Sequence, residues 1–192
     1  MAISMTSSTQ SPPHNEAQLA RQARASAEAF AELYHRYVQN VYRYHMAHTG
    51  NPKDAEDLTS QTFIAALEGI RSYRGSGPFI AWLMGIARRK RLLFFRDHPP
   101  EEPLESAGDV PDPAPPIDKT AAQRLQIQAV QRALQQISSD RAEAITLCIF
   151  GNLSCREAGH ALGKSEAAVR MLLSRGLQDL RDRTSLALEV ET

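Results

Sequence analysis

The chain has 192 residues, enough for one domain or two small ones, and its 22 basic residues balance 22 acidic residues. No stretch has the apolar length of a membrane span, and no signal segment opens the sequence, so we expect a cytoplasmic protein without membrane insertion. Two cysteines, Cys148 and Cys155, fit neither a disulfide framework nor a metal-ligand set. We expect them to be small buried side chains.

Overall neutrality hides an uneven charge distribution. Residues 26–98 carry ten basic and seven acidic side chains, and residues 119–185 carry ten basic and six acidic ones. Between them, residues 99–118 carry six acids and no base. Two basic modules flanking an acidic strap are a charge pattern relevant to nucleic acid.

The first 25 residues are rich in Ser, Thr, Gln and Pro, with no apolar period before Leu19, and most of them are expected to form a disordered tail. From Ser26 to about Gly50, apolar residues recur every three to four positions, which predicts one long amphipathic helix. These residues are Phe30, Leu33, Tyr34, Tyr37, Val38, Val41, Tyr42 and Met46.

A second helix is expected to begin at Asn51 and Pro52, because Asn is a favoured N-cap and Pro suits the first helical position. It should end near residue 70. Its candidate core residues are Leu58, Phe63, Leu67 and Ile70. Two glycines and a proline predict a loop over residues 71–78, and a third helix follows over residues 79–96.

The third helix combines aromatic and basic residues. Rings that stack on bases, at about 1–3 kcal/mol each, and cations that follow phosphates suit single-stranded DNA. The candidate residues are Tyr73, Arg74, Phe79, Trp82, Arg88, Arg89, Lys90 and Arg91. A core role remains open for Trp82, since Leu83 and Ile86 share a plausible apolar face with it, and the basic run could simply be solvated.

Seven prolines and six acids make residues 99–118 an expected extended linker. Helical periodicity resumes near residue 125, and another helix is expected over about 140–150. We predict an all-α fold of two helical modules, residues 26–98 and 119–185, joined by a flexible, acidic, Pro-rich linker and followed by a short tail at 186–192.

Residues 153–180 predict a helix-turn-helix, a unit that fits the DNA major groove. Ser154 and Glu157 form a capping box, Gly159 allows close packing, and Gly163 allows the tight turn. Ser165 caps a second helix. Its expected apolar face holds Val169, Leu172 or Leu173, Leu177 and Leu180, and its opposite face holds Arg170, Ser174, Arg175, Gln178 and Arg181.

Three segments resemble the second conserved region of sigma-70-type factors, most nearly the small extracytoplasmic-function group. They are Ala55-Glu-Asp-Leu-Thr-Ser-Gln-Thr-Phe63, Tyr73-Arg-Gly, and Ala81-Trp-Leu-Met-Gly-Ile-Ala-Arg88. Residues 137–181 resemble the fourth region of the same family. The resemblance implies a non-enzymatic initiation factor that lends promoter specificity to RNA polymerase, with no cofactor and no metal.

The resemblance also implies partners. The second helix would dock on the polymerase β′ clamp through Asp54, Glu56, Asp57 and Gln61, and a contact with the β flap is expected. The loop at 71–79 would hold a flipped base of the −10 element, and the helix at 79–96 would contact the melted strand. The helix at 165–181 would bind the −35 duplex through Ser165, Arg170, Ser174, Arg175 and Arg181. An anti-sigma protein could hold the two modules.

The chain departs from the family pattern at several positions. Arg89 stands where the family commonly has Asn, Leu93 where it has Asp, and Leu172 and Ser174 where basic residues are usual. The recognition helix therefore offers fewer cations than the family norm, and we expect weak or altered base readout from Arg170 and Arg175.

Two alternatives belong to other classes. A stand-alone helix-turn-helix regulator would use the first module for dimerisation or ligand sensing, and would bind duplex DNA without polymerase. An enzyme would need a metal or nucleophile site, for which His35, His45 and His48 are candidates. Their spacing matches no common metal motif, so we expect surface histidines on a tyrosine-rich helix.

Overall fold

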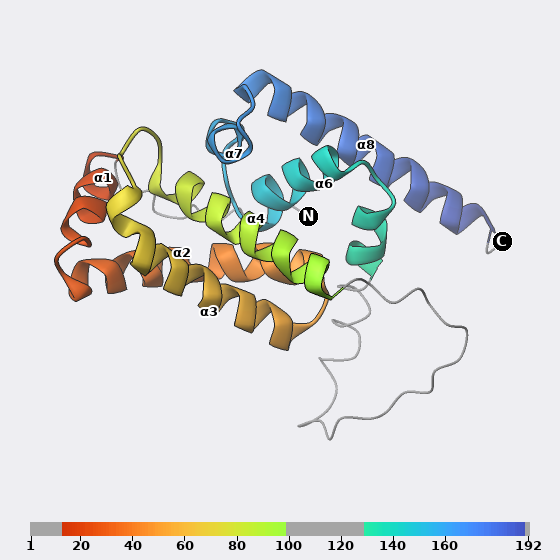
Figure 1. Ribbon diagram of the computed structural model, residues 1–192. Helices are drawn as coiled ribbons and strands as arrows, with labels where there is room; N and C mark the ends of the chain where they lie inside the picture. The colour runs from red at the N-terminus through yellow and green to blue at the C-terminus, as the bar shows by residue number, and fades with distance from the viewer. Residues whose placement is uncertain (1–12, 99–128, 191–192) are drawn as a thin grey trace, which may run out of the picture.

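The computed structural model describes residues 13–98 and 129–190, with side chains over 16–98 and 129–182. All the regular elements within these residues are helical, which confirms the all-α prediction (Figure 1). The first module holds α1 (Pro13–Gln22), α2 (Ala27–Thr49), α3 (Pro52–Gly69) and α4 (Phe79–Asp97). The second holds helical residues 129–135, α6 (Ser139–Ile145), a π-helical segment (Thr146–Phe150), α7 (Cys155–Leu162) and α8 (Glu166–Val190). The expected linker at 99–118 lies outside the described residues.

The expected disordered tail is corrected from residue 13 onward, because residues 13–22 form helix α1, and residues 1–12 lie outside the described residues. Leu19 is buried in the core of the first module. Glu16 accepts a hydrogen bond of 2.7 Å from the hydroxyl of Tyr37 on α2, and one of 3.3 Å from the backbone N–H of Ile80 on α4. Three buried apolar side chains, those of Leu19, Ala20 and Ala23, and one carboxylate thus anchor a segment whose composition alone suggests disorder.

Local signals set the ends of α2 and α3 where the sequence predicts them. The Ser26 hydroxyl caps α2 by accepting from the N–H of Ala29, and Gly50 ends it in the left-handed region at φ 64°. The Asn51 side chain caps α3 by accepting from the N–H of Lys53. Only glycine adopts the Gly50 conformation readily, so the chain turns sharply between two antiparallel helices.

Burial corrects two details of these helices. Leu67, an expected core residue, is 51% exposed, and Ile64 is 57% exposed. The face of α3 that packs on α2 runs instead through Leu58, Phe63 and Ala66. On α2, His45 is fully buried, where a surface histidine was expected. It is tolerated because its Nε2 lies 3.1 Å from the hydroxyl of Thr62, which satisfies one ring nitrogen.

The helix-turn-helix has the predicted local chemistry. The Ser154 hydroxyl accepts from the N–H of Glu157, and the Glu157 carboxylate accepts from the N–H of Ser154 at 2.8 Å. Gly163 makes the turn at φ 65°. A Cβ on Gly159 would lie 2.7 Å from the backbone oxygen of Lys164, closer than real contacts allow, so glycine is required there.

Helix α8 differs from the prediction in its packed face and its end. Leu177 is 38% exposed, whereas Val169 and Gly176 are buried. A Cβ on Gly176 would meet Ile145 of α6 at 2.8 Å, so α6 packs directly on the α8 backbone there. The helix continues to Val190, past the tail expected from residue 186, because no glycine or proline interrupts the sequence.

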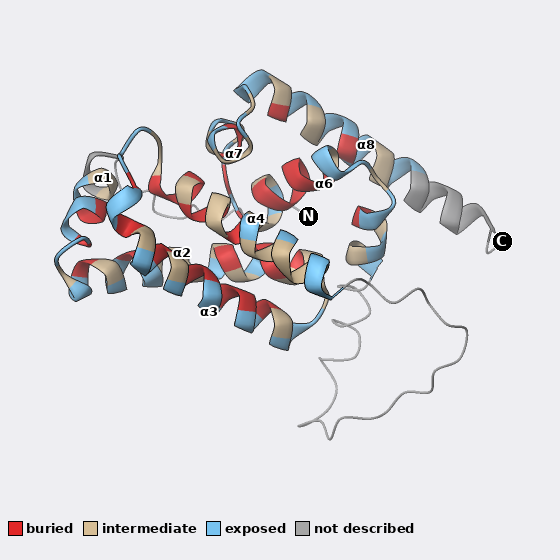
Figure 2. Ribbon diagram, viewed as in Figure 1, coloured by how far each residue is buried: buried red, intermediate tan, exposed pale blue. Residues whose placement is uncertain are grey.

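The two modules pack on each other and share one apolar core (Figure 2). Leu83 and Met84 of α4 lie in the same buried cluster as Leu147, Leu153 and Ala158 of the second module. The Asn40 side-chain amide donates to the backbone oxygen of Gly151 at 2.7 Å across the interface. The sequence predicts two modules, and the structure docks them into a single body.

Both cysteines, expected to be small buried side chains, are unpaired thiols that pack against the core and are partly buried. Burial raises the pKa of Cys148 to about 12, and neighbouring Cys155 adds to this effect. The Cys148 thiol is therefore protonated and weakly nucleophilic at neutral pH. Of the helices in the described part of the chain, none has both the length and the apolar character needed to cross a bilayer.

Candidate nucleic-acid interface

The loop between α3 and α4 is closed by its own tyrosine. The Tyr73 hydroxyl donates to the backbone oxygen of Gly77 at 2.6 Å, and the guanidinium of Arg24 donates to the backbone oxygen of Tyr73. Gly75 takes a left-handed conformation at φ 74°, which the tight bend requires. One hydrogen bond thus closes the loop on itself, and the other ties its first residue to the segment after α1.

Three aromatic rings cluster where this loop meets α4. Tyr73 and Phe79 meet edge to face with centroids 5.4 Å apart, and Trp82 lies 5.4 Å from Phe79. Tyr73 is 4% exposed and Phe79 is fully buried. Both were expected to contact the DNA strand. In this structure they are core residues that support Trp82, the one ring of the three that keeps a partly exposed surface.

Trp82 lines a hollow of about 370 Å³ between α3 and α4. Arg89 and Lys90 lie on the same wall, opposite Gly69 and Ser72. Arg89 is exposed and Lys90 is partly exposed. A flat aromatic ring next to two cations offers a stacking surface and phosphate partners in one place, as single-stranded nucleic acid requires.

A second hollow, of about 260 Å³, lies on the loop side of Trp82. Arg74 and the loop backbone line it, together with His160 from α7 of the other module. A Cβ placed on Gly77 would lie 3.3 Å from Nδ1 of His160, so the imidazole stands directly against the loop. Sequence reasoning did not single out His160, because nothing local connects it to a loop more than eighty positions earlier.

The other two cations of the α4 run lie beside a carboxylate of the second module, where Arg91 is nearly buried and the Arg88 side chain stays 41% exposed. Arg91 forms an ion pair and hydrogen bond with Glu143 of α6, and the Nε of Arg88 lies 3.6 Å from the same carboxylate. The Glu143 side chain is 3% exposed and that of Arg91 is 12% exposed. The run therefore divides into Arg89 and Lys90, which face the hollow, and Arg88 and Arg91, which face the second module.

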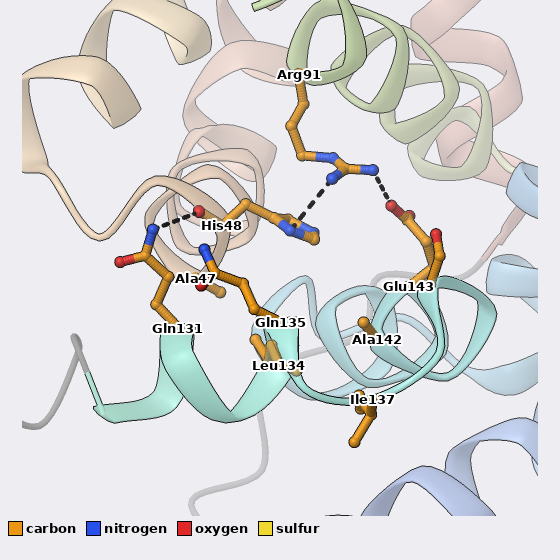
Figure 3. Close-up of a pocket in the computed structure, with 10 residues that line it drawn as sticks. Ala47, His48, Arg91, Gln131, Leu134, Gln135, Ile137, Ala142 and Glu143 are labelled. Carbon is orange, nitrogen blue, oxygen red and sulfur yellow. Dashed lines mark hydrogen bonds and ion pairs between the residues drawn. The ribbon is translucent and has the colours of Figure 1, made fainter. Parts of the chain in front are cut away.

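A hydrogen-bond network surrounds this ion pair (Figure 3). Arg91 Nε donates to the Tyr44 hydroxyl at 3.1 Å, and that hydroxyl lies 3.3 Å from Glu143. Burial and the charge of Glu143 raise the pKa of Tyr44, so the phenol stays protonated. Figure 3 shows Arg91 directed between His48 and Glu143, at the edge of a cavity of about 220 Å³ between the modules.

His48 completes the network as a neutral imidazole. Burial, followed by the charges of Arg91 and His45, lowers its pKa well below 6.5. The Thr146 hydroxyl donates to the backbone oxygen of Ala142 at 2.9 Å, so it accepts from Nε2 of His48 at 3.1 Å. This assignment leaves Nδ1 as the acceptor for Arg91 at 3.4 Å.

The residues expected on the polymerase-facing helix lie together on the outer side of α3. Glu56, Asp57 and Gln61 are exposed and Asp54 is half-buried. The exposed side chains of Ile64 and Leu67 lie one and two turns further along. The sequence pattern missed these two, because helical spacing alone assigned Leu67 to the core. The surface therefore combines carboxylates with apolar area.

The expected DNA-reading face of α8 is open to solvent. All five of its candidates are exposed: Ser165, Arg170, Ser174, Arg175 and Arg181. Ser165 accepts from the N–H of Ala168 at 3.2 Å, which confirms its capping role. Arg170 pairs with Glu166 at 2.6 Å, an exposed i,i+4 pair that costs little to break. In the described part of the chain, no three His, Cys, Asp or Glu side chains group as a metal site.

Comparison with known proteins identifies the family. Residues 33–99 match the model of sigma-70 region 2, and residues 127–180 match that of sigma-70 region 4. The ECF RNA polymerase sigma factor BldN of Streptomyces coelicolor is 32% identical over 160 residues, covering 80% of this chain and 60% of BldN. The ECF sigma factor SigE of Mycolicibacterium smegmatis is 31% identical, covering 82% of this chain and 62% of SigE.

A solved structure shares the fold. The sigma factor RpoE of Bartonella quintana, in complex with the anti-sigma factor NepR, superposes with a TM-score of 0.60 at 20% identity, over 81% of this chain and 96% of that one. With both regions matched, the chain belongs to the sigma-70 family. Its relatives place it in the extracytoplasmic-function group, as the sequence resemblance predicts.

Proposed function

We propose that this chain directs bacterial RNA polymerase to promoters and assists melting of the −10 element. The observation that carries the proposal is Trp82 between two hollows, with Arg89 and Lys90 beside it, in the same chain as an exposed helix-turn-helix face. The first arrangement suits separated strands and the second suits duplex DNA. An initiation factor needs both, whereas a stand-alone regulator needs only the second.

The proposed roles follow the geometry. Glu56, Asp57 and Gln61, with Ile64 and Leu67 beside them, form the polymerase-docking surface. Trp82, Arg74, Arg89 and Lys90 form the strand-binding surface, which Arg88 and Arg91 would join once released from Glu143. Ser165, Arg170, Ser174, Arg175 and Arg181 form the −35 surface. Tyr73 and Phe79 support Trp82 from the core. No catalytic step is assigned to the chain, and its work on polymerase and DNA places it in the cytoplasm.

An anti-sigma partner is a further expectation of this proposal. RpoE, which shares the fold, was solved with its anti-sigma factor NepR. The exposed apolar side chains Ile64 and Leu67 give such a partner a surface that would compete with polymerase.

The proposal is tested with purified core polymerase. The chain should co-purify with the core enzyme, and run-off transcription from a promoter library should give start sites with shared −35 and −10 elements. Duplex DNA binding by the free chain, without any association with polymerase, would favour the stand-alone regulator and refute the proposal.

Asp57→Ala tests the docking surface. It should reduce co-purification with core polymerase and leave the melting temperature unchanged, because Asp57 is exposed. Glu32→Ala is the matched control, since Glu32 is an exposed carboxylate on α2 that pairs with Arg36 of its own helix. Equal retention of both variants on the polymerase would contradict the assignment of α3.

A further inference from the structure

We propose that the segment before α2 sets the geometry of the strand-binding surface, with Arg24 and Glu16 as its two positioning residues. This inference rests on the proposed function, because it names residues that prepare that same surface for the strand. Both residues precede the match to sigma-70 region 2, which begins at residue 33. Neither side chain would bind the strand itself, since each holds a group on which the strand-binding residues depend.

Arg24 holds the start of the loop between α3 and α4. It lies in the turn after α1, and its guanidinium donates to the backbone oxygen of Tyr73. A charged donor makes this hydrogen bond stronger than one between neutral groups. The Tyr73 hydroxyl in turn donates to the backbone oxygen of Gly77 at 2.6 Å. Whatever fixes Tyr73 therefore also fixes the loop that it closes.

Glu16 holds the other end of this loop. Its Oε1 accepts at 3.3 Å from the backbone N–H of Ile80, which lies in the first turn of α4 and shortly before Trp82. The same oxygen accepts at 2.7 Å from the hydroxyl of Tyr37. Two side chains of one short segment thus bind the residues on either side of the loop.

Tyr37 carries the effect of Glu16 to the aromatic rings. The Tyr37 ring lies 5.9 Å from that of Phe79, and the Phe79 ring lies 5.4 Å from that of Trp82. Burial and, after it, the hydrogen bond to Glu16 raise the pKa of Tyr37, so the phenol keeps the proton that it donates. Orienting Tyr37 therefore orients the buried ring against which Trp82 packs.

The bonds from Arg24 and Glu16 act before any strand is present. Ordering a loop and a ring during binding would cost free energy and reduce the affinity for the strand. Trp82 stacks on a base only while its ring keeps the right orientation. Arg74 and the loop backbone line the hollow beside this ring, so they depend on the same bonds. Loss of Arg24 or Glu16 should thus loosen the surface without removing a group that touches the strand.

The test uses the full chain with Arg24→Met, which removes the hydrogen bond and keeps an unbranched side chain. Arg21→Met is the matched control, because Arg21 is an exposed arginine of α1 whose charge also acts on Tyr73. Trp82 is the only tryptophan in the sequence, so tryptophan fluorescence reports on this surface alone. Two quantities are measured: the quenching of this fluorescence by acrylamide, and the affinity for a labelled random-sequence single strand of about 12 nucleotides at several salt concentrations.

We expect Arg24→Met to increase the acrylamide quenching of Trp82 and to weaken strand binding about fivefold. The slope of log affinity against log salt concentration should stay that of the unaltered chain, because a positioning residue releases no counterions. Arg21→Met should leave the quenching unchanged. A shallower slope for Arg24→Met would mean that Arg24 binds a phosphate directly, and unchanged quenching would mean that it does not position Trp82. Either result would overturn its role.

Glu16→Met tests the second positioning residue, and it keeps the inference testable should Arg24→Met fail to fold, as judged by circular dichroism. It should increase the quenching and weaken strand binding about threefold. Glu32→Met, at an exposed position on α2, should do neither. Glu16→Gln should behave as the unaltered chain, because its amide oxygen can accept both hydrogen bonds that Oε1 accepts. A Glu16→Gln chain as impaired as Glu16→Met would overturn the role of this acceptor.

Failure of the proposed function is distinguishable from failure of this inference, because both measurements use the free chain without polymerase. A chain whose variants behave as expected here, but which never supports run-off transcription, would refute the proposed function and leave the positioning roles of Arg24 and Glu16 intact. A chain that supports run-off transcription, but whose Trp82 quenching is unchanged in Arg24→Met and Glu16→Met, would do the reverse.

Discussion

The two helices expected to contact DNA, α4 and α8, meet solvent very differently. On α8 the candidate side chains, including Arg170 and Arg175, are exposed. On α4, Arg91 is nearly buried in an ion pair with Glu143 of the other module, and Arg88 lies beside the same carboxylate. Under the proposed function this asymmetry follows the order of events, since the duplex −35 element exists before melting and the separated −10 strand exists only afterwards.

The largest expected effect is on stability, and it should differ between the buried and the exposed arginines of the α4 basic run. Arg91→Met should lower the free energy of unfolding by about 3 kcal/mol, because it leaves the buried Glu143 without its main partner. Arg89→Met, at an exposed position two residues away, should stay within about 0.5 kcal/mol. Urea unfolding of both variants measures the difference, and equal losses would show that the run is not divided.

Low pH should reduce the stability of the first module, because this module carries the buried histidines His45 and His48. Burial, followed by the charge of Arg91, lowers the pKa of His45 from 6.5 to about 3. Below pH 6.5 the unfolded chain binds a proton that the folded chain excludes, so stability falls as the pH falls from that value toward 3.

Protonation of His45 in the unfolded chain should lower the free energy of unfolding by about 2 kcal/mol between pH 7 and pH 5. His48, beside Arg91 and Tyr44, adds to it with the same sign. Urea midpoints across this range should fall less steeply in His45→Gln than in the unaltered chain. Parallel slopes would mean that the pKa of His45 does not differ between the folded and the unfolded chain.

Arg175→Ala tests whether the exposed face of α8 contacts the −35 duplex. Loss of one base contact should reduce transcription from −35-dependent promoters about tenfold and leave polymerase association intact. Arg132→Ala, an exposed arginine of the second module that lies outside the helix-turn-helix, is the control. Transcription unaffected on every promoter would show that α8 faces the duplex with another side.

The smallest effect concerns the stability of the helix-turn-helix. Ser154→Ala removes the cap that accepts from the N–H of Glu157 at 3.2 Å, and should cost about 1 kcal/mol. Ser60→Ala, in the exposed middle of α3, should cost nothing, because alanine is the better helix former. Thermal melting distinguishes the two, and similar melting temperatures would contradict the capping box.

Helix caps and turns could be predicted from the sequence wherever a few neighbouring residues determine the structure. Gly50, Asn51, Ser154 and Gly163 act through their own backbone or within three positions, and the structure has them in the predicted roles. The resemblance to sigma factors rested on such short runs, and the family comparison confirms it.

Contacts between segments distant in the sequence could not be predicted in this way. Tyr73 and Phe79 carry the composition of a DNA-binding loop, yet their rings fill the core. Glu143 looks like any helical glutamate until α4 places two arginines beside it. Leu67 and Leu177 follow helical spacing but lie on solvent faces, because the packing partner selects which stripe of a helix is buried.

Glu16 has a consequence for where this protein can be shortened. Its carboxylate accepts from the Tyr37 hydroxyl and from one N–H in the first turn of α4, that of Ile80, so it supplies the side-chain acceptor that Pro78 cannot. A chain cut back to Ser26, the boundary that composition suggests, would lose this acceptor and the Leu19 anchor together. The helix that carries Trp82 would then begin without an acceptor at its positive end, and fraying would start at the strand-binding site itself.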